Sequence, residues 1–205
     1  QGVRFDNCFC TNSICTPSRA AILTGTYNHV NGVTTLTTPL DNRLTTYPKL
    51  MQAAGYQTAI FGKWHLGHRR AKWHPLNQGF NHFHGHYNGA IDYFTHEREG
   101  ELDWHRDYES NHDEGYTTDL IADAAVAFIN QHAKGGSPFL CYVPFNAPHS
   151  PLQAKGGDLS EYEHLANAEP QFGTGTKDPA LFGLRGRGQS KRQTLAAMIS
   201  SMDQG

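Results

Sequence analysis

The sequence predicts an α/β fold with a mostly parallel or mixed central sheet and helices on both of its faces. Short apolar segments typical of strands alternate along the chain with segments of helical pattern, as in open α/β sheets. Polar residues with chemical potential follow directly after the apolar segments, where such sheets place their ligands. The length of 205 residues is sufficient for one domain of this kind, and we find no internal repeat.

The first predicted elements are a short strand over residues 3–9 and a helix that begins near Cys15. Thr16 is a suitable N-cap, because its hydroxyl can accept a free backbone N–H. Pro17 suits the first helical position, since its φ is fixed near the helical value. Gly25 is a natural C-terminal stop. Cys15 is therefore expected at a helix N-terminus.

The remaining elements follow from hydrophobic periodicity and from Gly and Pro punctuation. The clearest helix covers 117–132, where apolar residues recur at i, i+1, i+4 and i+5 until Gly135 and Gly136 end the pattern. In chain order we expect a helix over 45–54, a buried strand over 56–64, a loop-rich, His-rich segment over 67–115, the helix over 117–132, a buried strand over 139–145, an irregular segment over 155–189 and a helix over 191–202.

The composition excludes two classes of protein. The formal net charge is −2, so the chain has no bulk basic field for nucleic acid. Hydrophobic residues make up 38%, and no apolar run is long enough to span a membrane. The 21 glycines and 10 prolines predict many loops, which suits a site built from loops.

The four cysteines form no C-x-x-C zinc pattern. Cys8 and Cys10 point the same way on an extended segment; they can pair with other cysteines or, as we expect, remain buried thiols. Cys141 lies in an apolar run and is expected to pack in the core. Among the four cysteines, only Cys15 lies in a sequence pattern that indicates a chemical role.

Cys15 and Arg19 are one helical turn apart at a helix N-terminus. There the helix dipole and the free N–H groups favour an anion. The guanidinium of Arg19 can reach the same place and bind an oxyanion by two N–H donors. The functional interpretation is an anion site with a nucleophile; the structural alternative is a buried cysteine beside a surface arginine.

Four blocks of sequence resemble the type I sulfatase family. Cys15 to Gly25, C-T-P-S-R-A-A-I-L-T-G, resembles the signature at which the family's cysteine is oxidised to formylglycine. Residues 62–67, G-K-W-H-L-G, and 146–152, N-A-P-H-S-P-L, resemble two further family blocks in the family's order. Residues 79–98 resemble the arylsulfatase B-like branch. The resemblance implies an alkaline-phosphatase-like fold and a sulfuric ester hydrolase of the arylsulfatase type.

The resemblance also implies catalytic roles for five residues. Cys15, as formylglycine, is the nucleophile and a calcium ligand, and Arg19 holds it. Lys63 contacts sulfate oxygens, His65 hydrogen-bonds the formylglycine diol, and His149 protonates the leaving group. Independently, Lys63 and His65 are two apart on an extended stretch and share one face. Taken singly, a solvated lysine and buried core histidines remain the structural alternatives.

The implied cofactor is Ca²⁺, whose remaining ligands are expected outside this chain. The implied partners are a formylglycine-generating enzyme during maturation and a substrate that is an aryl sulfate or a sulfated carbohydrate, including sulfated polysaccharide. We interpret residues 1–205 as an internal fragment of the N-terminal catalytic domain, without its first strand and C-terminal portion, and inactive alone. The parent protein is expected to be secreted, periplasmic or lysosomal.

Substrate contacts are expected in the His-rich segment, where side chains can hydrogen-bond sugar hydroxyls. The alternation of His82, His84 and His86 also permits a transition-metal site, or an ordinary polar loop. Arg185 and Arg187 are expected in a solvated loop, with contact to a polyanionic glycan as the alternative. The candidate substrate-binding residues are His84, His86, Tyr87, Asp92 and Tyr93.

Two other functions remain open at this point. Phosphonate monoester hydrolases and phosphodiesterases of the same superfamily share the fold, and some share the formylglycine. A glycan-binding pseudoenzyme is the non-enzymatic alternative. The presence of Cys15, Arg19, Lys63, His65 and His149 favours an enzyme, because a binding protein needs no modifiable cysteine.

Overall fold

The computed structural model describes residues 3–167 and 185–205 and contains a five-stranded mixed sheet. Its strand order is β6-β5-β2-β1-β7, with β1 parallel to β2 and β7, and β5 antiparallel to β2 and β6. The α/β fold with a mixed sheet is therefore confirmed. The strands are β1 (Gln57–Lys63), β2 (His82–His86), β5 (His105–Arg106), β6 (Glu109–Ser110) and β7 (Phe139–Tyr142), and β3 (Glu97–Arg98) pairs with β4 (Glu101–Leu102) in a separate ribbon.

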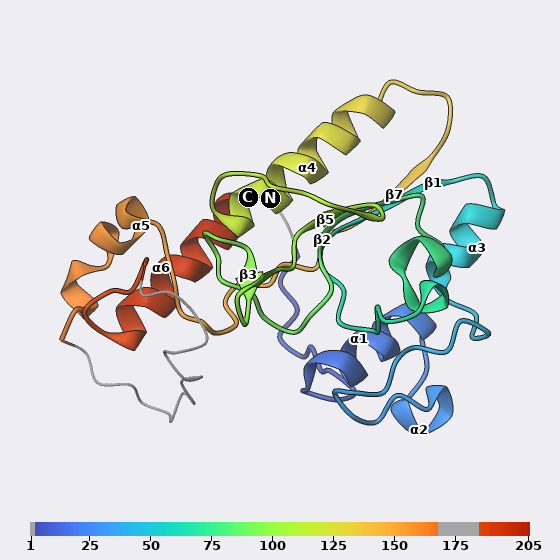
Figure 1. The fold of residues 1–205 in the computed structure, drawn as a ribbon, viewed down its shortest axis with the longest axis horizontal. Coiled ribbons are helices and arrows are strands. Elements are labelled where there is room, and N and C mark those ends of the chain that lie inside the picture. The colour runs from blue at the N-terminus through green and yellow to red at the C-terminus, as the bar shows by residue number, and fades with distance from the viewer. Residues whose placement is uncertain (1–2, 168–184) are drawn as a thin grey trace.

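Helices cover both faces of the sheet (Figure 1). Strand β1 alternates: Ile60 faces a core cluster with α1 (Cys15–Thr24), whereas Ala59 and Phe61 face a cluster with α4 (Thr117–His132). Helix α3 (Tyr47–Ala53) also contacts β1. The other helical elements are α2 (Asn28–Asn31), α5 (Gly156–Glu161), α6 (Lys191–Gln204) and the 3₁₀ turns η1 (Ala71–Trp73), η2 (Pro75–Asn77) and η3 (Glu163–Leu165).

A third core cluster joins α6 to the loops around Tyr93 and Ala147. In Figure 1 this part, with α5 and α6, lies on the opposite side of the molecule from α1 and α2. No helix among residues 3–167 and 185–205 is long and apolar enough to cross a membrane.

The N-terminal expectations are partly wrong. Residues 3–9 form no strand, because no neighbouring strand pairs with them and their side chains are exposed, as in Phe9 at 87%. Cys8 and Cys10 are exposed free thiols, not buried ones. The described residues around them provide no apolar layer that would cover these thiols.

Helix α1 begins two residues earlier than it would with Thr16 as its N-cap. Ile14 occupies the N-cap position without a side-chain cap, and Cys15 is the first helical residue. Thr16 instead donates its hydroxyl to the carbonyl oxygen of Leu36 at 3.2 Å. Pro17 therefore lies in the first turn but not at its first position. Gly25 ends the helix with φ 65°, as expected.

Most of the later elements are confirmed, and three expectations need correction. The segment 67–115 contains the central strand β2, which was missed because His82–His86 is rich in polar residues yet buried on both faces. Strand β7 ends at Tyr142 and is half-buried, since it forms an edge of the described sheet. The segment expected to be irregular over 155–189 contains α5 and η3, and residues 168–184 of it lie outside the described residues.

Candidate active site

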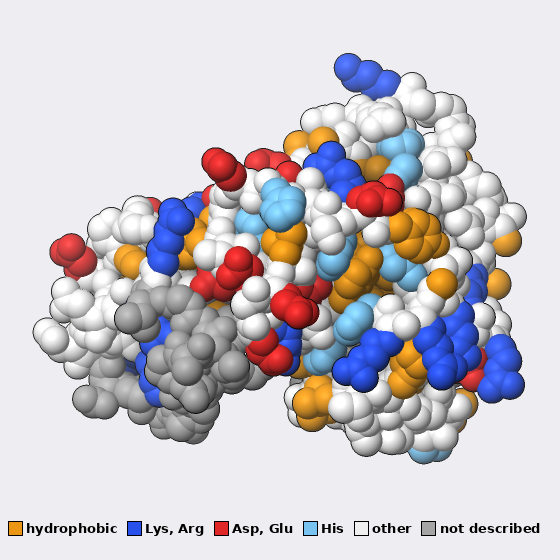
Figure 2. Space-filling model, viewed as in Figure 1, with side chains coloured by type: hydrophobic (Ala, Val, Ile, Leu, Met, Phe, Trp, Pro, Cys, Tyr) orange, Lys and Arg blue, Asp and Glu red, His pale blue; other side chains and the backbone are white. Residues whose placement is uncertain are grey.

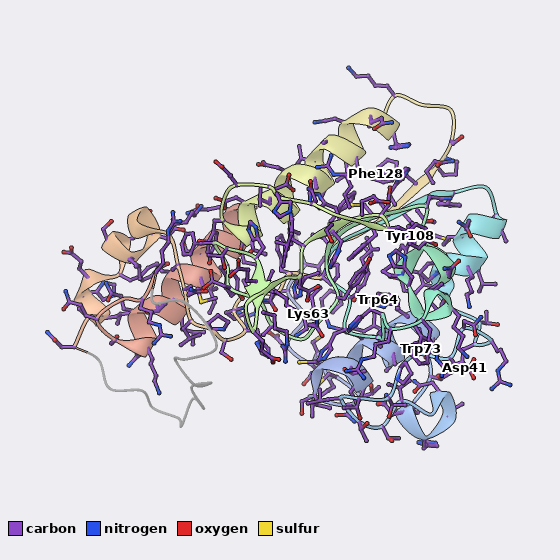
Figure 3. The ribbon with its side chains drawn as sticks, viewed as in Figure 1. Asp41, Lys63, Trp64, Trp73, Tyr108 and Phe128 are labelled. Atoms are coloured by element: carbon purple, nitrogen blue, oxygen red, sulfur yellow. The ribbon has the colours of Figure 1, made fainter. Side chains whose placement is uncertain are left out.

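Three segments meet at the carboxyl end of the parallel strands. Lys63 is the last residue of β1, Cys15 is the first residue of α1, and His149 follows β7. Because β1 and β7 are parallel, their carboxyl ends lie at the same edge of the sheet. Figure 3 shows Lys63 near the centre of the molecule, between the strands and the ribbon of α1. The fold thus brings three distant parts of the sequence together.

Cys15 lies among positively charged and hydrogen-bonding side chains. The Nζ of Lys63 donates to the Sγ of Cys15 at 3.4 Å, and Lys63 is only 2% exposed. The Nη1 of Arg19 donates to the carbonyl oxygen of Lys63 at 2.6 Å, which ties the first turn of α1 to the end of β1. His149 and His65 add side-chain hydrogen bonds to Cys15. The five sequence-predicted catalytic residues therefore form one cluster.

These contacts stabilise negative charge on the sulfur. Hydrogen bonds from His149 and His65, together with the charge of Lys63, lower the pKa of Cys15 from 9.0 to about 4, against the opposing effect of burial. Burial lowers the pKa of Arg19 and also that of His65. The cluster is thus built to hold an anion at the position of the Cys15 side chain.

His65 is held in an unusual backbone conformation. Its φ is 54°, a left-handed value that is uncommon outside glycine, and Trp64 before it is buried in the core. Its backbone N–H donates to the carbonyl oxygen of Tyr87 at 3.0 Å. A Cβ at Gly89 would lie 2.5 Å from Cε1 of His65, so the bare backbone of Gly89 packs against the imidazole. The loop after β2 therefore sets the position of this ring.

His149 is oriented by two hydrogen bonds. Its Nδ1 donates to the carbonyl oxygen of Ser150 at 2.7 Å, which leaves Nε2 as the nitrogen for a reacting group. The hydroxyl of Tyr93 donates to the backbone carbonyl of His149 at 2.9 Å. Tyr93, which was expected to bind substrate, is fully buried and supports His149.

The other candidate substrate residues are also engaged or covered. His84 is buried and pairs with Asp113 at 2.8 Å, beside Trp104 of the α4-side cluster. His86 is fully buried, neither ring nitrogen has a hydrogen-bond partner, and burial lowers its pKa to about 3. Asp92 is buried and accepts the backbone N–H groups of the next turn. Two of the five candidates line pockets: His84 lines one on the α4 side with Phe128, and Tyr87 lines the pocket next to His65.

The structure also bears on metal binding and on the basic loop. Among residues 3–167 and 185–205, no group of three His, Cys, Asp or Glu side chains could hold a metal ion, so the His82–His86 alternation is not a metal site. The described contacts of Cys15 are cationic or imidazole groups, not carboxylates, and these residues alone do not fit a Ca²⁺ cage. Arg185 is exposed and lies over the ring of Phe94 at 4.2 Å.

The support behind His65 has no signal in the local sequence. The buried carboxylate of Asp103 accepts the backbone N–H groups of Tyr87 and Asn88, each at 2.9 Å. It also accepts the side-chain amide of Asn88 and a ring nitrogen of His105. Asp103 lies far along the chain from Tyr87, and no local pattern could indicate the contact. The same holds for the packing of Gly89 on His65.

Comparison with known proteins shows the family to which the chain belongs. A family model described as Sulfatase matches residues 1–205, and the chain belongs to the sulfatase family. The solved structures that it resembles include sulfatases with an alkaline-phosphatase-like fold, which confirms the expected fold. A crystal structure of Ps i-CgsB in complex with k-i-k-neocarrahexaose aligns with a TM-score of 0.76 and 25% identity, over 95% of this chain and 43% of that chain.

The names of the similar curated proteins describe enzymes that act on sulfated compounds. The chain is 39% identical over 172 residues to N-acetylglucosamine-6-O-sulfatase of Bacteroides thetaiotaomicron, covering 83% of this chain and 28% of that protein. It is 33% identical to arylsulfatase J of Mus musculus, covering 82% and 30%. A solved structure in complex with its substrate D-glucosamine-2-N,6-O-disulfate is 34% identical, with a TM-score of 0.67, over 83% of this chain and 32% of that chain. The chain thus spans about a third of the length of these relatives.

Proposed function

We propose that the natural protein containing this chain hydrolyses sulfuric esters, with Cys15 as the precursor of its nucleophile. The observation that carries the proposal is the clamp around Cys15, in which Lys63, His65 and His149 all contact one sulfur atom. A sulfate ester brings anionic oxygens to the same place. Preorganised donors and cations that stabilise charge in the transition state are the largest contribution to many hydrolytic reactions.

The surroundings of Cys15 suit its conversion to formylglycine. The side chain is half-exposed at the first turn of α1, with donors arranged to hold an oxyanion. As a hydrated aldehyde, the residue would supply a geminal diol. One hydroxyl would attack sulfur and displace the alcohol of the ester, and the second would lose its proton as the aldehyde re-forms and sulfate leaves. We further propose that a formylglycine-generating enzyme makes this modification, and that the natural protein is secreted, periplasmic or lysosomal.

The remaining residues have separable roles in this proposal. Lys63 neutralises sulfate oxygens, and Arg19 fixes the end of β1 against α1 through its bond to the Lys63 carbonyl. His65 holds the diol and accepts a proton from it. His149 protonates the leaving alkoxide through Nε2, since Nδ1 is bound to the Ser150 carbonyl. General acid catalysis of this kind contributes about 10²–10⁴-fold.

We propose a sulfated carbohydrate as the substrate class. Support comes from relatives whose names specify N-acetylglucosamine-6-O-sulfatase and N-acetylgalactosamine-6-sulfatase, and from the solved relative with a bound disulfated glucosamine. Aryl sulfates are the convenient assay substrates, and arylsulfatase J is among the relatives.

Mass spectrometry of the Cys15 peptide tests the nucleophile. We expect an aldehyde or its hydrate at position 15 in protein from its own host, and an ordinary thiol at the exposed Cys8, which is the internal control. The full natural chain should hydrolyse an aryl sulfate, and Cys15→Ala should abolish turnover while Cys8→Ser preserves it. An unmodified thiol throughout, with no sulfate released, would refute the proposal.

The same assay separates the proposed function from its nearest competitor. A phosphonate monoester hydrolase would turn over an aryl phosphonate faster than the matching aryl sulfate. A higher kcat/KM for the sulfate supports a sulfatase, and the reverse order assigns the protein to the phosphonate-hydrolysing relatives. Sugar binding without turnover of either ester would indicate a pseudoenzyme.

A further inference from the structure

Two pockets that share lining residues form a groove beside His65. Its inner pocket has a volume of about 540 Å³ and is bordered by His65, Trp73, Tyr87 and Asn88. An outer pocket of about 620 Å³ shares Tyr87 and Asn88 with it. Both volumes lie within the range typical of small-ligand sites. The groove is therefore large enough for a sugar residue next to the catalytic cluster.

Two guanidinium groups line both pockets. Arg69 follows β1, and Arg98 lies on β3, so two separate segments supply them. None of the described residues that line the inner pocket is Asp or Glu. The carboxylates of Glu99, Glu101 and Asp103 border only the outer pocket. The inner pocket therefore carries positive charge that no acidic side chain of its own lining balances.

Arg98 is fixed in place and Arg69 is unengaged. The Nη1 of Arg98 donates to the carbonyl oxygen of Ala90 at 3.2 Å, and its side chain is 30% exposed. Its Nη2 lies 3.3 Å from Glu99, whose side chain is 59% exposed. Arg69 is exposed, and within residues 3–167 and 185–205 it makes no hydrogen bond or ion pair. A fixed guanidinium and a free one on the same pocket are suited to bind an anion in two-pronged fashion.

The neutral lining of the inner pocket is suited to a sugar. Thr37, Thr38 and Asn88 offer groups that hydrogen-bond hydroxyls, while Trp73 and Tyr87 contribute aromatic surface. Figure 2 shows Lys, Arg and His side chains gathered on this part of the surface, around the place where Figure 3 labels Trp73. Acidic side chains gather instead toward the middle of the same face.

We propose that the groove is a second anion subsite, which binds a sulfate or carboxylate group on the substrate in addition to the sulfate presented to Cys15. The inference rests on the proposed sulfatase function and specifies it further. The preferred substrate is a sugar, or a pair of sugars, that carries two acidic groups. The group held between Arg69 and Arg98 remains on the product.

The test compares substrates with one and with two anionic groups on the full natural chain. The probes are p-nitrophenyl sulfate, a monosulfated hexosamine, the same hexosamine with a second sulfate, and the monosulfated hexosamine linked to a uronate. We expect kcat/KM to be at least about 10-fold higher for a dianionic sugar than for the monosulfated one, because hydrogen bonds to charged groups contribute about 1.5–3 kcal/mol. Whichever dianionic substrate has the higher kcat/KM, the disulfated hexosamine or the uronate-linked one, identifies the second anion as sulfate or carboxylate.

Two substitutions locate the effect. Arg69→Gln and Arg98→Gln should each remove most of the preference, mainly through KM, and leave p-nitrophenyl sulfate turnover within about 2-fold. Arg70→Gln is the matched control, because Arg70 lies over Trp73 at 5.3 Å but lines neither pocket. Since Arg98 holds Ala90 and its replacement can unfold the loop, Arg69→Gln carries the test if Arg98→Gln is unstable.

Failure of the subsite is distinguishable from failure of the sulfatase function. Equal kcat/KM for monosulfated and dianionic sugars, with p-nitrophenyl sulfate hydrolysed normally, overturns the subsite alone. An Arg69→Gln variant that loses p-nitrophenyl sulfate turnover as well also overturns it, since the arginine then acts on the reaction centre. Absence of all sulfate release, with an unmodified Cys15, refutes the proposed function. The subsite can still be tested by calorimetry in that case. Binding of the disulfated hexosamine to the Cys15→Ser variant, and loss of this binding in the double variant Cys15→Ser, Arg69→Gln, would support it.

Discussion

Replacing Gly89 by alanine should displace the imidazole of His65. The added Cβ would lie 2.5 Å from Cε1, 2.9 Å from Nε2 and 3.1 Å from Nδ1 of the His65 imidazole. Ordinary contact begins at 3.4 Å, so the ring must retreat by about 0.9 Å. Gly89 does not have a left-handed φ, so alanine is compatible with its backbone. The backbone of His65 cannot follow easily, because its N–H is bound to Tyr87.

Two measurements follow from this displacement. A shift of about 1 Å in a reacting group can cost about 10²-fold in rate, so kcat for p-nitrophenyl sulfate should fall by about that factor in the full natural chain. In the unmodified thiol form, the hydrogen bond from His65 is one of the causes of the low pKa of Cys15. Weakening that bond removes a donor to the thiolate, so the pKa of Cys15 should rise.

Gly136→Ala is the control for the change of glycine to alanine. A Cβ at Gly136 meets no atom within 4 Å, and its φ is not left-handed. Such substitutions change stability by about 0.4–1 kcal/mol through the unfolded chain. The reasoning is refuted if Gly89→Ala retains kcat within about 3-fold of wild type. A fall in Tm without a change in the Cys15 pKa would equally contradict it, because instability alone leaves the surviving site intact.

Three further predictions address the clamp, its support and the core. The Cys15 thiolate should persist from neutral pH down to about 4, because a lowered pKa preserves the charged form until the pH falls below that pKa. The rate of Cys15 alkylation, followed by peptide mass spectrometry, measures this. A rate that rises only above pH 8 would exclude the clamp. Burial raises the pKa of Asp103, but hydrogen bonds from His105, Tyr87 and Asn88 hold that pKa below its usual range. Asp103→Asn should therefore lower the free energy of unfolding by about 1–3 kcal/mol, lower kcat/KM by roughly 10-fold and flatten the loss of stability below pH 4. Unchanged unfolding in urea would contradict this prediction. Phe128→Ala should destabilise the protein by about 3–5 kcal/mol, and Val126→Ala, on the exposed side of α4, by far less; equal losses would disprove the assigned helix face.

Elements that depend on interactions between residues near in sequence were predictable, and elements that depend on distant contacts were not. Helix α4 was predicted with its observed bounds, because apolar spacing and the terminating glycines act within one or two turns. The end of α1 at Gly25 was likewise local. Strand β2 was not predicted. The polar run His82–His86 forms a strand because it pairs with β1 and β5, and no local sequence pattern indicates that pairing.

The candidate site shows the same division. The five residues of the Cys15 cluster were recognisable from three separated blocks, and the structure places them in mutual contact, while their catalytic roles remain predictions. Tyr93 was expected to contact substrate, but it is buried, and its hydroxyl donates to the backbone carbonyl of His149. Its burial depends on α6 and on Ala147, which are distant in sequence.

Local chemistry along the chain was enough to predict the family, the α/β class and the residue types that surround Cys15. Such features depend on neighbours within one or two helical turns or on a short conserved-looking block of residues. The tertiary structure alone decided that His84 and His86 of β2 are buried, that Asp103 and Gly89 hold His65 in place, and that Arg69 and Arg98 share one pocket. Those features arise where segments distant in sequence pack together, so burial and charge at each position depend on contacts that only the folded chain makes.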